Sequence, residues 1–82
     1  MTTQKETITL LADLMGIEET EIKAEMSLDN DLGFDSLFRS ELAMILEERH
    51  ECLITLEEIR ALDTVSHVID FICKIKKASK AN

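Results

Sequence analysis

The chain has 82 residues, which is room for one small domain, and we expect a single domain over residues 1–82. It carries 17 acidic and 9 basic side chains, for a formal charge of −8, so its surface should repel nucleic acid and anionic lipid and favour partners with basic patches. No segment is apolar for long enough to cross a bilayer, and the first residues lack a signal-peptide hydrophobic region, so we expect a cytoplasmic protein without membrane contact.

The composition favours an all-α fold. Proline is absent, the two glycines are Gly16 and Gly33, and the hydrophobic residues, which make up 45% of the chain, recur at helical spacing. The two cysteines, Cys52 and Cys73, are expected to be reduced thiols because no secretory signal accompanies them.

The first helix is predicted to begin near residue 4, because Thr3 and Glu6 have the spacing of a capping box. Gly16 is its predicted C-terminal stop. One face of this helix is apolar and contains Ile8, Leu11, Leu14 and Met15.

A long connection is predicted over residues 17–35, with a short helical turn at residues 18–21. Connections of this length without regular structure are unusual in a compact domain and are usually functional. Dispersed apolar residues are expected to hold it across the bundle, namely Ile22, Met26, Leu28 and Leu32.

The second helix is predicted over about residues 36–50. As its N-cap, Asp35 can accept hydrogen bonds from the first-turn N–H groups, which leaves Ser36 at the first helical position with its hydroxyl facing water. Gly33 lets the preceding loop turn sharply into the helix. The positive end of the helix dipole suits a phosphate ester on Ser36.

Rotation of about 100° per residue divides this helix into two faces. Core residues are predicted at Leu42, Ile45 and Leu46, and Phe38 lies at the edge of that arc. The opposite face contains Ser36, Leu37, Ser40, Glu41, Met44, Glu47 and Glu48. Its mixture of carboxylates with exposed Leu37 and Met44 is typical of a docking surface, and a merely solvated face remains the alternative.

Two further helices complete the pattern. Thr55 and Glu58 form a second capping box before a short helix, and Asp63 or Thr64 caps the last one. The last helix has a regular apolar stripe of Val65, Val68, Ile69, Ile72 and Ile75. Residues 78–82 should form a frayed tail. We therefore expect a small antiparallel four-helix bundle, with three main helices, one short helix and a long first loop.

At the start of the second helix the chain resembles the acyl carrier protein family, including the peptidyl carrier domains. The motif is Leu32-Gly33-Phe34-Asp35-Ser36-Leu37, followed at the family's spacing by Glu41-Leu42, Met44 and Leu46-Glu47-Glu48. The resemblance continues through residues 64–65 and 69–72, so it covers nearly the whole chain.

The resemblance implies that Ser36 carries 4′-phosphopantetheine, which a phosphopantetheinyl transferase takes from coenzyme A, with Asp35 and Leu37 beside it at the cofactor site. The thiol of the arm would hold acyl or aminoacyl groups as thioesters. No catalytic base accompanies Ser36, since Asp35 is a poor base at neutral pH and His50 lies a whole helix away. We therefore expect a substrate of enzymes and not an enzyme, with no catalytic residues of its own.

Expected partners are the transferase and acyl-transfer or condensing enzymes with basic docking patches, and the carrier itself should be a monomer. Charges at such an interface mainly steer encounter and set specificity. The predicted partner-binding residues are Leu37, Arg39, Ser40, Glu41, Met44, Glu47 and Glu48.

Three residues depart from the commonest fatty-acid carrier pattern. Arg39 is a cation where such carriers tend to be acidic or neutral, Ser40 replaces a frequent apolar contact, and Thr55 stands where proline is common. The first two are expected to change the docking face. They favour a freestanding carrier of polyketide or nonribosomal-peptide biosynthesis over a housekeeping fatty-acid carrier. An unmodified acidic helical interaction module is the alternative from another class.

Carriers of this kind can open a channel between helices and shelter an acyl chain. The candidate lining residues here are Leu46, Ile54, Ile59, Leu62 and Ile72.

Other chemistries fit the sequence poorly. The residues His50, Cys52, His67 and Cys73 lack zinc-finger spacing, and we expect no metal site. An EF-hand centred on Gly33 would place leucines at ligand positions. A helix-turn-helix DNA binder conflicts with the acidic balance, and an enzyme would need a nucleophile–base pair and a larger core.

Overall fold

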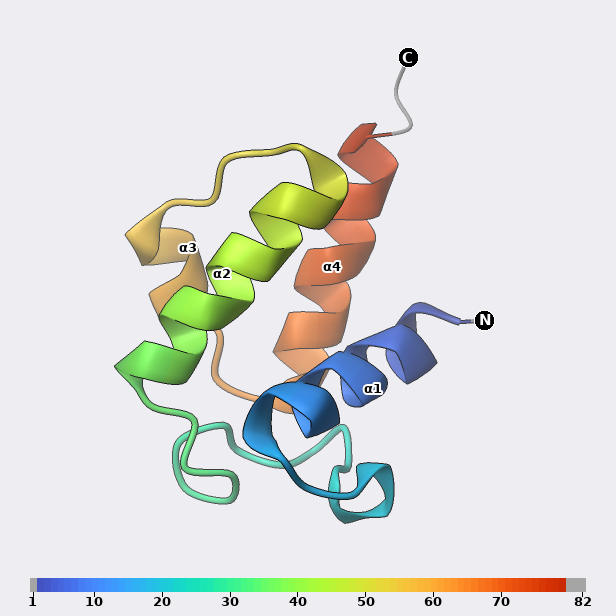
Figure 1. Cartoon of the computed structure of the whole chain (residues 1–82), viewed down its shortest axis with the longest axis vertical. Helices are drawn as coiled ribbons and strands as arrows, with labels where there is room; N and C mark the ends of the chain where they lie inside the picture. Colours follow the sequence, from blue (N-terminus) through green and yellow to red (C-terminus); the bar gives the residue numbers. More distant parts are fainter. Residues whose placement is uncertain (1, 80–82) are drawn as a thin grey trace.

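Four α-helices and one turn of 3₁₀ helix make up the structure, a computed structural model that describes residues 2–79 (Figure 1). The elements are α1 (Thr3–Met15), η1 (Glu19–Glu21), α2 (Ser36–His50), α3 (Leu56–Arg60) and α4 (Val65–Ser79). Within the described residues there is no strand, only an isolated bridge between Ser27 and Thr64. The predicted all-α bundle with a long first loop is confirmed.

The connection between α2 and α4 determines how the main helices run. It includes α3 and brings the chain back along the length of α2, so that α2 and α4 both begin at the lower end of the view in Figure 1. These two helices therefore run in the same direction, and the antiparallel order expected of the bundle does not hold for this pair.

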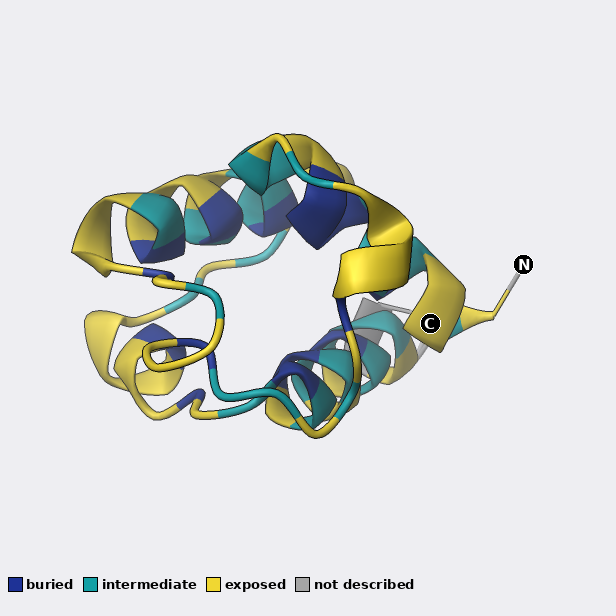
Figure 2. Cartoon of the chain, turned by 90° about the horizontal axis from the view of Figure 1, so that it is seen from below, coloured by how far each residue is buried: buried dark blue, intermediate teal, exposed yellow. Residues whose placement is uncertain are grey.

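The core lies between the helices, whose buried parts face inward while their exposed parts face outward (Figure 2). The predicted core residues Leu42 and Leu46 are buried, and Ile45 packs against the core from a half-buried position. Phe34, which the sequence pattern did not assign to the core, is fully buried. The buried hydrophobic residues are Leu10, Leu11, Ala12, Ile22, Leu28, Phe34, Leu42, Leu46, Ile59, Leu62, Val65, Val68 and Ile72.

The long first loop is ordered by backbone hydrogen bonds to the beginning of α4. Leu28 N–H donates to the carbonyl of Asp63 at 2.8 Å, Val65 N–H to Met26 at 3.0 Å and Ser66 N–H to Ala24 at 2.8 Å. The predicted apolar anchors are confirmed, because Ile22 and Leu28 are buried and Met26 and Leu32 pack against the core. The short turn predicted near residues 18–21 is η1.

Local capping signals fix most helix ends. Gly16 ends α1 with φ of +69°, and Thr55 and Glu58 form the predicted capping box at α3. Of the two predicted caps of α4, Thr64 accepts a hydrogen bond from the backbone N–H of His67 at 3.2 Å. The ring of His67 returns this contact, since its Nδ1 accepts from the N–H groups of Asp63 and Thr64.

The prediction for the start of α1 was wrong by one residue. Thr2 is the N-cap, and its hydroxyl accepts from the backbone N–H of Lys5 at 3.1 Å. Thr3 is already inside the helix, and the carboxylate of Glu6 forms an ion pair with Lys76 of α4 instead of a capping box. Of the predicted tail, Ala78 and Ser79 belong to α4, and residues 80–82 lie outside the described residues.

The ion pair between Glu6 and Lys76 joins α1 to α4. The Lys76 ammonium donates to the Glu6 carboxylate and to the hydroxyl of Thr3, 3.4 Å away. This hydrogen bond from Lys76 holds the pKa of the Glu6 carboxyl below its ordinary value of 4.5. The contact therefore stabilises the packing of α1 on α4 only while Glu6 is ionised.

We predict that Glu6→Gln lowers the free energy of unfolding at neutral pH and has less effect in acid. Because the pKa of Glu6 is lower in the folded state, its contribution is present above about pH 4.5 and is lost as pH falls through the folded-state pKa. Urea unfolding at about pH 7 and about pH 3 measures both differences. Asp13→Asn, at an exposed position of the same helix, is the control. An effect of Glu6→Gln that is equal at both pH values would contradict the prediction.

Candidate functional site

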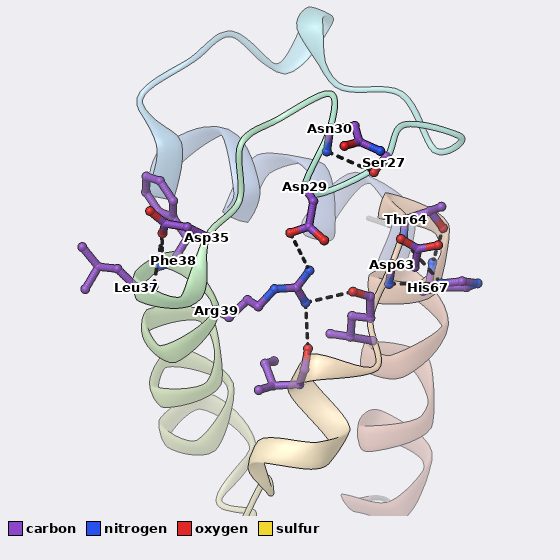
Figure 3. Close-up of polar contacts among 12 residues, drawn as sticks. Ser27, Asp29, Asn30, Asp35, Leu37, Phe38, Arg39, Asp63, Thr64 and His67 are labelled. Carbon is purple, nitrogen blue, oxygen red and sulfur yellow. Dashed lines mark hydrogen bonds and ion pairs between the residues drawn. The ribbon is translucent and has the colours of Figure 1, made fainter.

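Ser36 is the first residue of α2 and is exposed. The side chain of Asp35 caps the helix, since its Oδ1 accepts from the backbone N–H groups of Leu37 at 3.1 Å and Phe38 at 3.2 Å (Figure 3). Within residues 2–79, no group hydrogen-bonds to the Ser36 hydroxyl. Asp35 thus does the capping, as predicted, and the Ser36 oxygen is open to solvent for chemistry.

The loop before the site is held by Phe34. Gly33 has φ of +63°, a conformation that other residues rarely adopt, and it turns the chain so that the Phe34 ring enters the core. Phe34 N–H donates to the carbonyl of Leu28 at 2.7 Å, and its ring stacks on Phe38 with 5.6 Å between centroids. The position directly before a helix N-cap is often an apolar anchor, and this signal could have identified Phe34 from sequence.

Arg39 does not lie on the docking face, so its predicted placement was wrong. Only 9% of the residue is exposed, and its guanidinium donates to the carbonyls of Ile59 at 2.9 Å and Leu62 at 2.8 Å. It also contacts the carboxylate of Asp29 at 3.3 Å (Figure 3).

The helical period explains the position of Arg39. Leu42 and Leu46 follow at i+3 and i+7, so all three side chains lie on the buried side of α2. A charged residue can be buried there because carbonyl oxygens at the end of α3 and in the α3–α4 connection satisfy its donors. These partners lie 20 and 23 residues away, so no local sequence pattern indicates them.

The opposite side of α2 is an exposed face with two large apolar side chains. Leu37 is 64% exposed and Met44 63%, as the sequence predicted. We call the exposed residues of this side the α2 face, and they are Ser36, Leu37, Ser40, Glu41, Met44 and Glu48. Glu47 is half-buried, and its carboxylate accepts from the N–H of Ile54 at 2.9 Å, so it braces the α2–α3 connection.

The sequence pattern missed two exposed leucines beyond α2. Leu53 in the α2–α3 connection is 93% exposed, and Leu56 at the start of α3 is 64% exposed. The spacing of Leu56, Ile59 and Leu62 suggests one apolar face, but five residues of helix are too short for a reliable apolar period. Only their exposure in the structure distinguishes them from core leucines.

The cysteines and histidines form no second site. Partial burial, together with the carboxylates of Glu47 and Glu58, raises the pKa of the Cys52 thiol, which favours its protonated form at neutral pH. In the part of the chain that the structure describes, no three His, Cys, Asp or Glu residues are grouped to hold a metal ion. None of the helices described over residues 2–79 is long and apolar enough to span a membrane.

The fold and the exposed serine together define a small helical carrier domain. A helix begins at a solvent-exposed hydroxyl that Asp35 leaves unengaged as a cap. A comparison with protein families agrees with this class: the model described as "Phosphopantetheine attachment site" matches residues 5–72. The chain therefore belongs to the phosphopantetheine attachment-site family, whose members carry 4′-phosphopantetheine covalently.

The protein is accordingly a phosphopantetheine-carrying carrier protein. Domains of this family are typically non-catalytic substrates of transferases, and they interact with phosphopantetheinyl transferases and acyl-handling enzymes. The residues present fit the group, because the Ser36 hydroxyl is exposed, unbonded and located at the positive end of the α2 dipole.

We predict that Arg39→Met lowers the free energy of unfolding by about 1–3 kcal/mol. The Leu62 carbonyl would lose the guanidinium, the one partner it has among the described residues, while Ile59 keeps a 3.4 Å contact from Leu62 N–H. Urea unfolding monitored by circular dichroism measures the change.

Asp29→Asn is the matched control for this prediction. Asp29 is 64% exposed at the side chain, so losing its ion pair should cost less than about 1 kcal/mol. Equal effects of the two substitutions would show that the carbonyl contacts of Arg39 contribute no more than its surface ion pair.

Proposed function

We propose that Ser36 is the attachment point of the arm, and that the protein carries acyl intermediates as thioesters in polyketide or related secondary-metabolite biosynthesis. The observation that carries the proposal is the free hydroxyl at the first residue of α2, beside a carboxylate that already caps the helix. When bound, the arm supplies a thiol on which an acyl group is held as a thioester.

The attachment step balances as a phosphoryl-group transfer on coenzyme A. The Ser36 oxygen loses its proton to a base of the transferase and forms a bond to the β-phosphorus. The pyrophosphate P–O bond breaks, and adenosine 3′,5′-bisphosphate leaves. This chain contributes the exposed hydroxyl and the rigid first turn, with Asp35 fixing that turn and Leu37 exposed beside it.

The α2 face supports recognition by the transferase and by acyl-transfer and condensing enzymes. Leu37 and Met44 can enter apolar pockets, while Glu41 and Glu48 can meet basic residues around them. Leu37, Ser40, Glu41, Met44 and Glu48 remain our proposed partner contacts, and Asp35 stays at the attachment site. Glu47 is a weaker candidate because its carboxylate is engaged by Ile54.

The choice of pathway rests on Ser40. This exposed polar residue stands on the α2 face where fatty-acid carriers frequently have an apolar contact, which favours dedicated partners. Arg39 no longer supports the choice through docking, because it is buried. A housekeeping fatty-acid carrier is the second candidate within the family. We further propose that the carrier acts as a monomer in the cytoplasm.

An unmodified interaction module is the candidate from another class. The observation in its favour is that exposed Leu37 and Met44 lie among carboxylates, which suits a basic protein partner without any modification. Modification of Ser36 separates this candidate from the carrier.

We predict that a broad-specificity phosphopantetheinyl transferase with coenzyme A adds one phosphopantetheine to the wild-type chain. Intact-mass spectrometry should show the addition, and Ser36→Ala should abolish it because the accepting oxygen is gone. Ser40→Ala is the matched control, since it removes an exposed hydroxyl one turn further along the same face. An unshifted wild-type mass with several transferases, or labelling that persists in Ser36→Ala, would contradict the proposal.

We also predict that Leu37→Ala lowers kcat/KM of the transferase about tenfold or more. An apolar side chain of this size loses about 1.5–3 kcal/mol when it is no longer buried by a partner. Leu53→Ala is the control, because Leu53 is even more exposed but lies in the α2–α3 connection. A similar loss for both variants would mean that the α2 face does not direct recognition.

A further inference from the structure

Arg39 lies between the attachment residue and the interior of the bundle. It follows Ser36 by one helical turn, and its side chain extends from α2 toward the end of α3 and the first loop (Figure 3). A cargo on Ser36 that entered the bundle between α2 and α3 would have to pass this side chain.

The space next to the guanidinium is already filled. Phe34 is fully buried and stacks on Phe38, and the guanidinium carbon of Arg39 is 5.9 Å from the centre of the Phe34 ring. Ile59 is 2% exposed and Leu62 7%, so the segment that receives the guanidinium is itself part of the core. Two aromatic rings and a paired cation therefore occupy the region beneath the first turns of α2.

Opening this region would carry an electrostatic cost as well as a packing cost. To admit an alkyl chain, α2 and α3 must separate, and Arg39 must leave the carbonyls of Ile59 and Leu62. The Leu62 oxygen would then lose its donor and the cation would keep only its contact with Asp29, so both would be poorly paired next to hydrocarbon, which is unfavourable in a protein interior. An apolar residue at position 39 would impose no such cost.

We propose that Arg39 is a specificity-determining residue that keeps the cargo outside the bundle, so that this carrier suits short or polar acyl and aminoacyl groups and does not shelter long alkyl chains. The inference rests on the proposed attachment at Ser36. It replaces the expectation of a channel lined by Leu46, Ile54, Ile59, Leu62 and Ile72. Four of these residues, all except half-buried Ile54, are buried in the core.

The test compares cargoes of increasing length on the wild-type chain. The transferase loads acetyl-, hexanoyl- and dodecanoyl-phosphopantetheine from the corresponding coenzyme A esters, and intact mass verifies each product. A failure at this loading step counts against the proposed function, whereas the later readouts test only the role of Arg39. The readouts are the thermal unfolding midpoint and the amide chemical shifts of Leu46, Ile59, Leu62 and Ile72.

For the wild-type chain we expect the same midpoint and the same core amide shifts with all three cargoes. A cargo that binds inside the folded bundle stabilises it, so sheltering would raise the midpoint as the chain grows longer. A rise in midpoint with length, or core shifts that grow with length, would overturn the proposal.

Arg39→Met separates control of cargo from simple structural support. With the cation gone, the dodecanoyl form should unfold about 4–8 °C above the acetyl form, and the core shifts should depend on length. Asp29→Ala, which leaves both carbonyl contacts of Arg39 in place, should behave as wild type.

If Arg39→Met is less stable with every cargo but shows no dependence on length, Arg39 is only structural and the proposal fails. If that variant does not fold, the wild-type series still decides the outcome, because length dependence there would contradict a closed bundle.

Discussion

The carboxylate of Asp35 is the contact on which the site depends. The first N–H groups of any helix need acceptors, and here one oxygen of Asp35 serves two of them. A serine at the start of a helix is itself a common cap, and in that role its oxygen would be held by backbone N–H groups. Because Asp35 takes the role, the Ser36 hydroxyl stays exposed while the turn beneath it remains fixed.

Because side chains repeat about every 3.6 residues along a helix, one side of α2 is buried and the other is exposed. The side with Arg39, Leu42 and Leu46 is buried and joins α2 to α3 and to the core, whereas the side with Leu37 and Met44 is open to partners. The first loop supports the same end of the bundle through its backbone hydrogen bonds to the start of α4. The helix that bears the exposed hydroxyl is thus held in place by its packing on α3 and the core, and the loop before it is held by hydrogen bonds to α4.

The parts of this structure that follow from local signals were predictable from sequence. Asp35, Gly16 and the capping box of α3 act within a few residues, so the bounds of α2 and the ends of neighbouring helices could be read directly. Contacts between distant residues could not. Thr3 and Glu6 have the spacing of a capping box, but Thr2 caps α1 and Glu6 instead pairs with Lys76, 70 residues away. Arg39 was placed outside because its charge is visible in the sequence and its carbonyl partners are not.

The shortness of α3 explains why a cation is tolerated inside so small a protein. A helix of five residues leaves carbonyl oxygens in its last turn and just beyond it with no following turn to satisfy them. Neighbouring side chains must supply donors, and Arg39 supplies them to Ile59 and Leu62. Its third contact is with the exposed carboxylate of Asp29. The burial of the guanidinium and the closure of α2 on α3 are therefore one arrangement, since the cation would keep only Asp29 and the Leu62 carbonyl would lose its donor if the two helices moved apart.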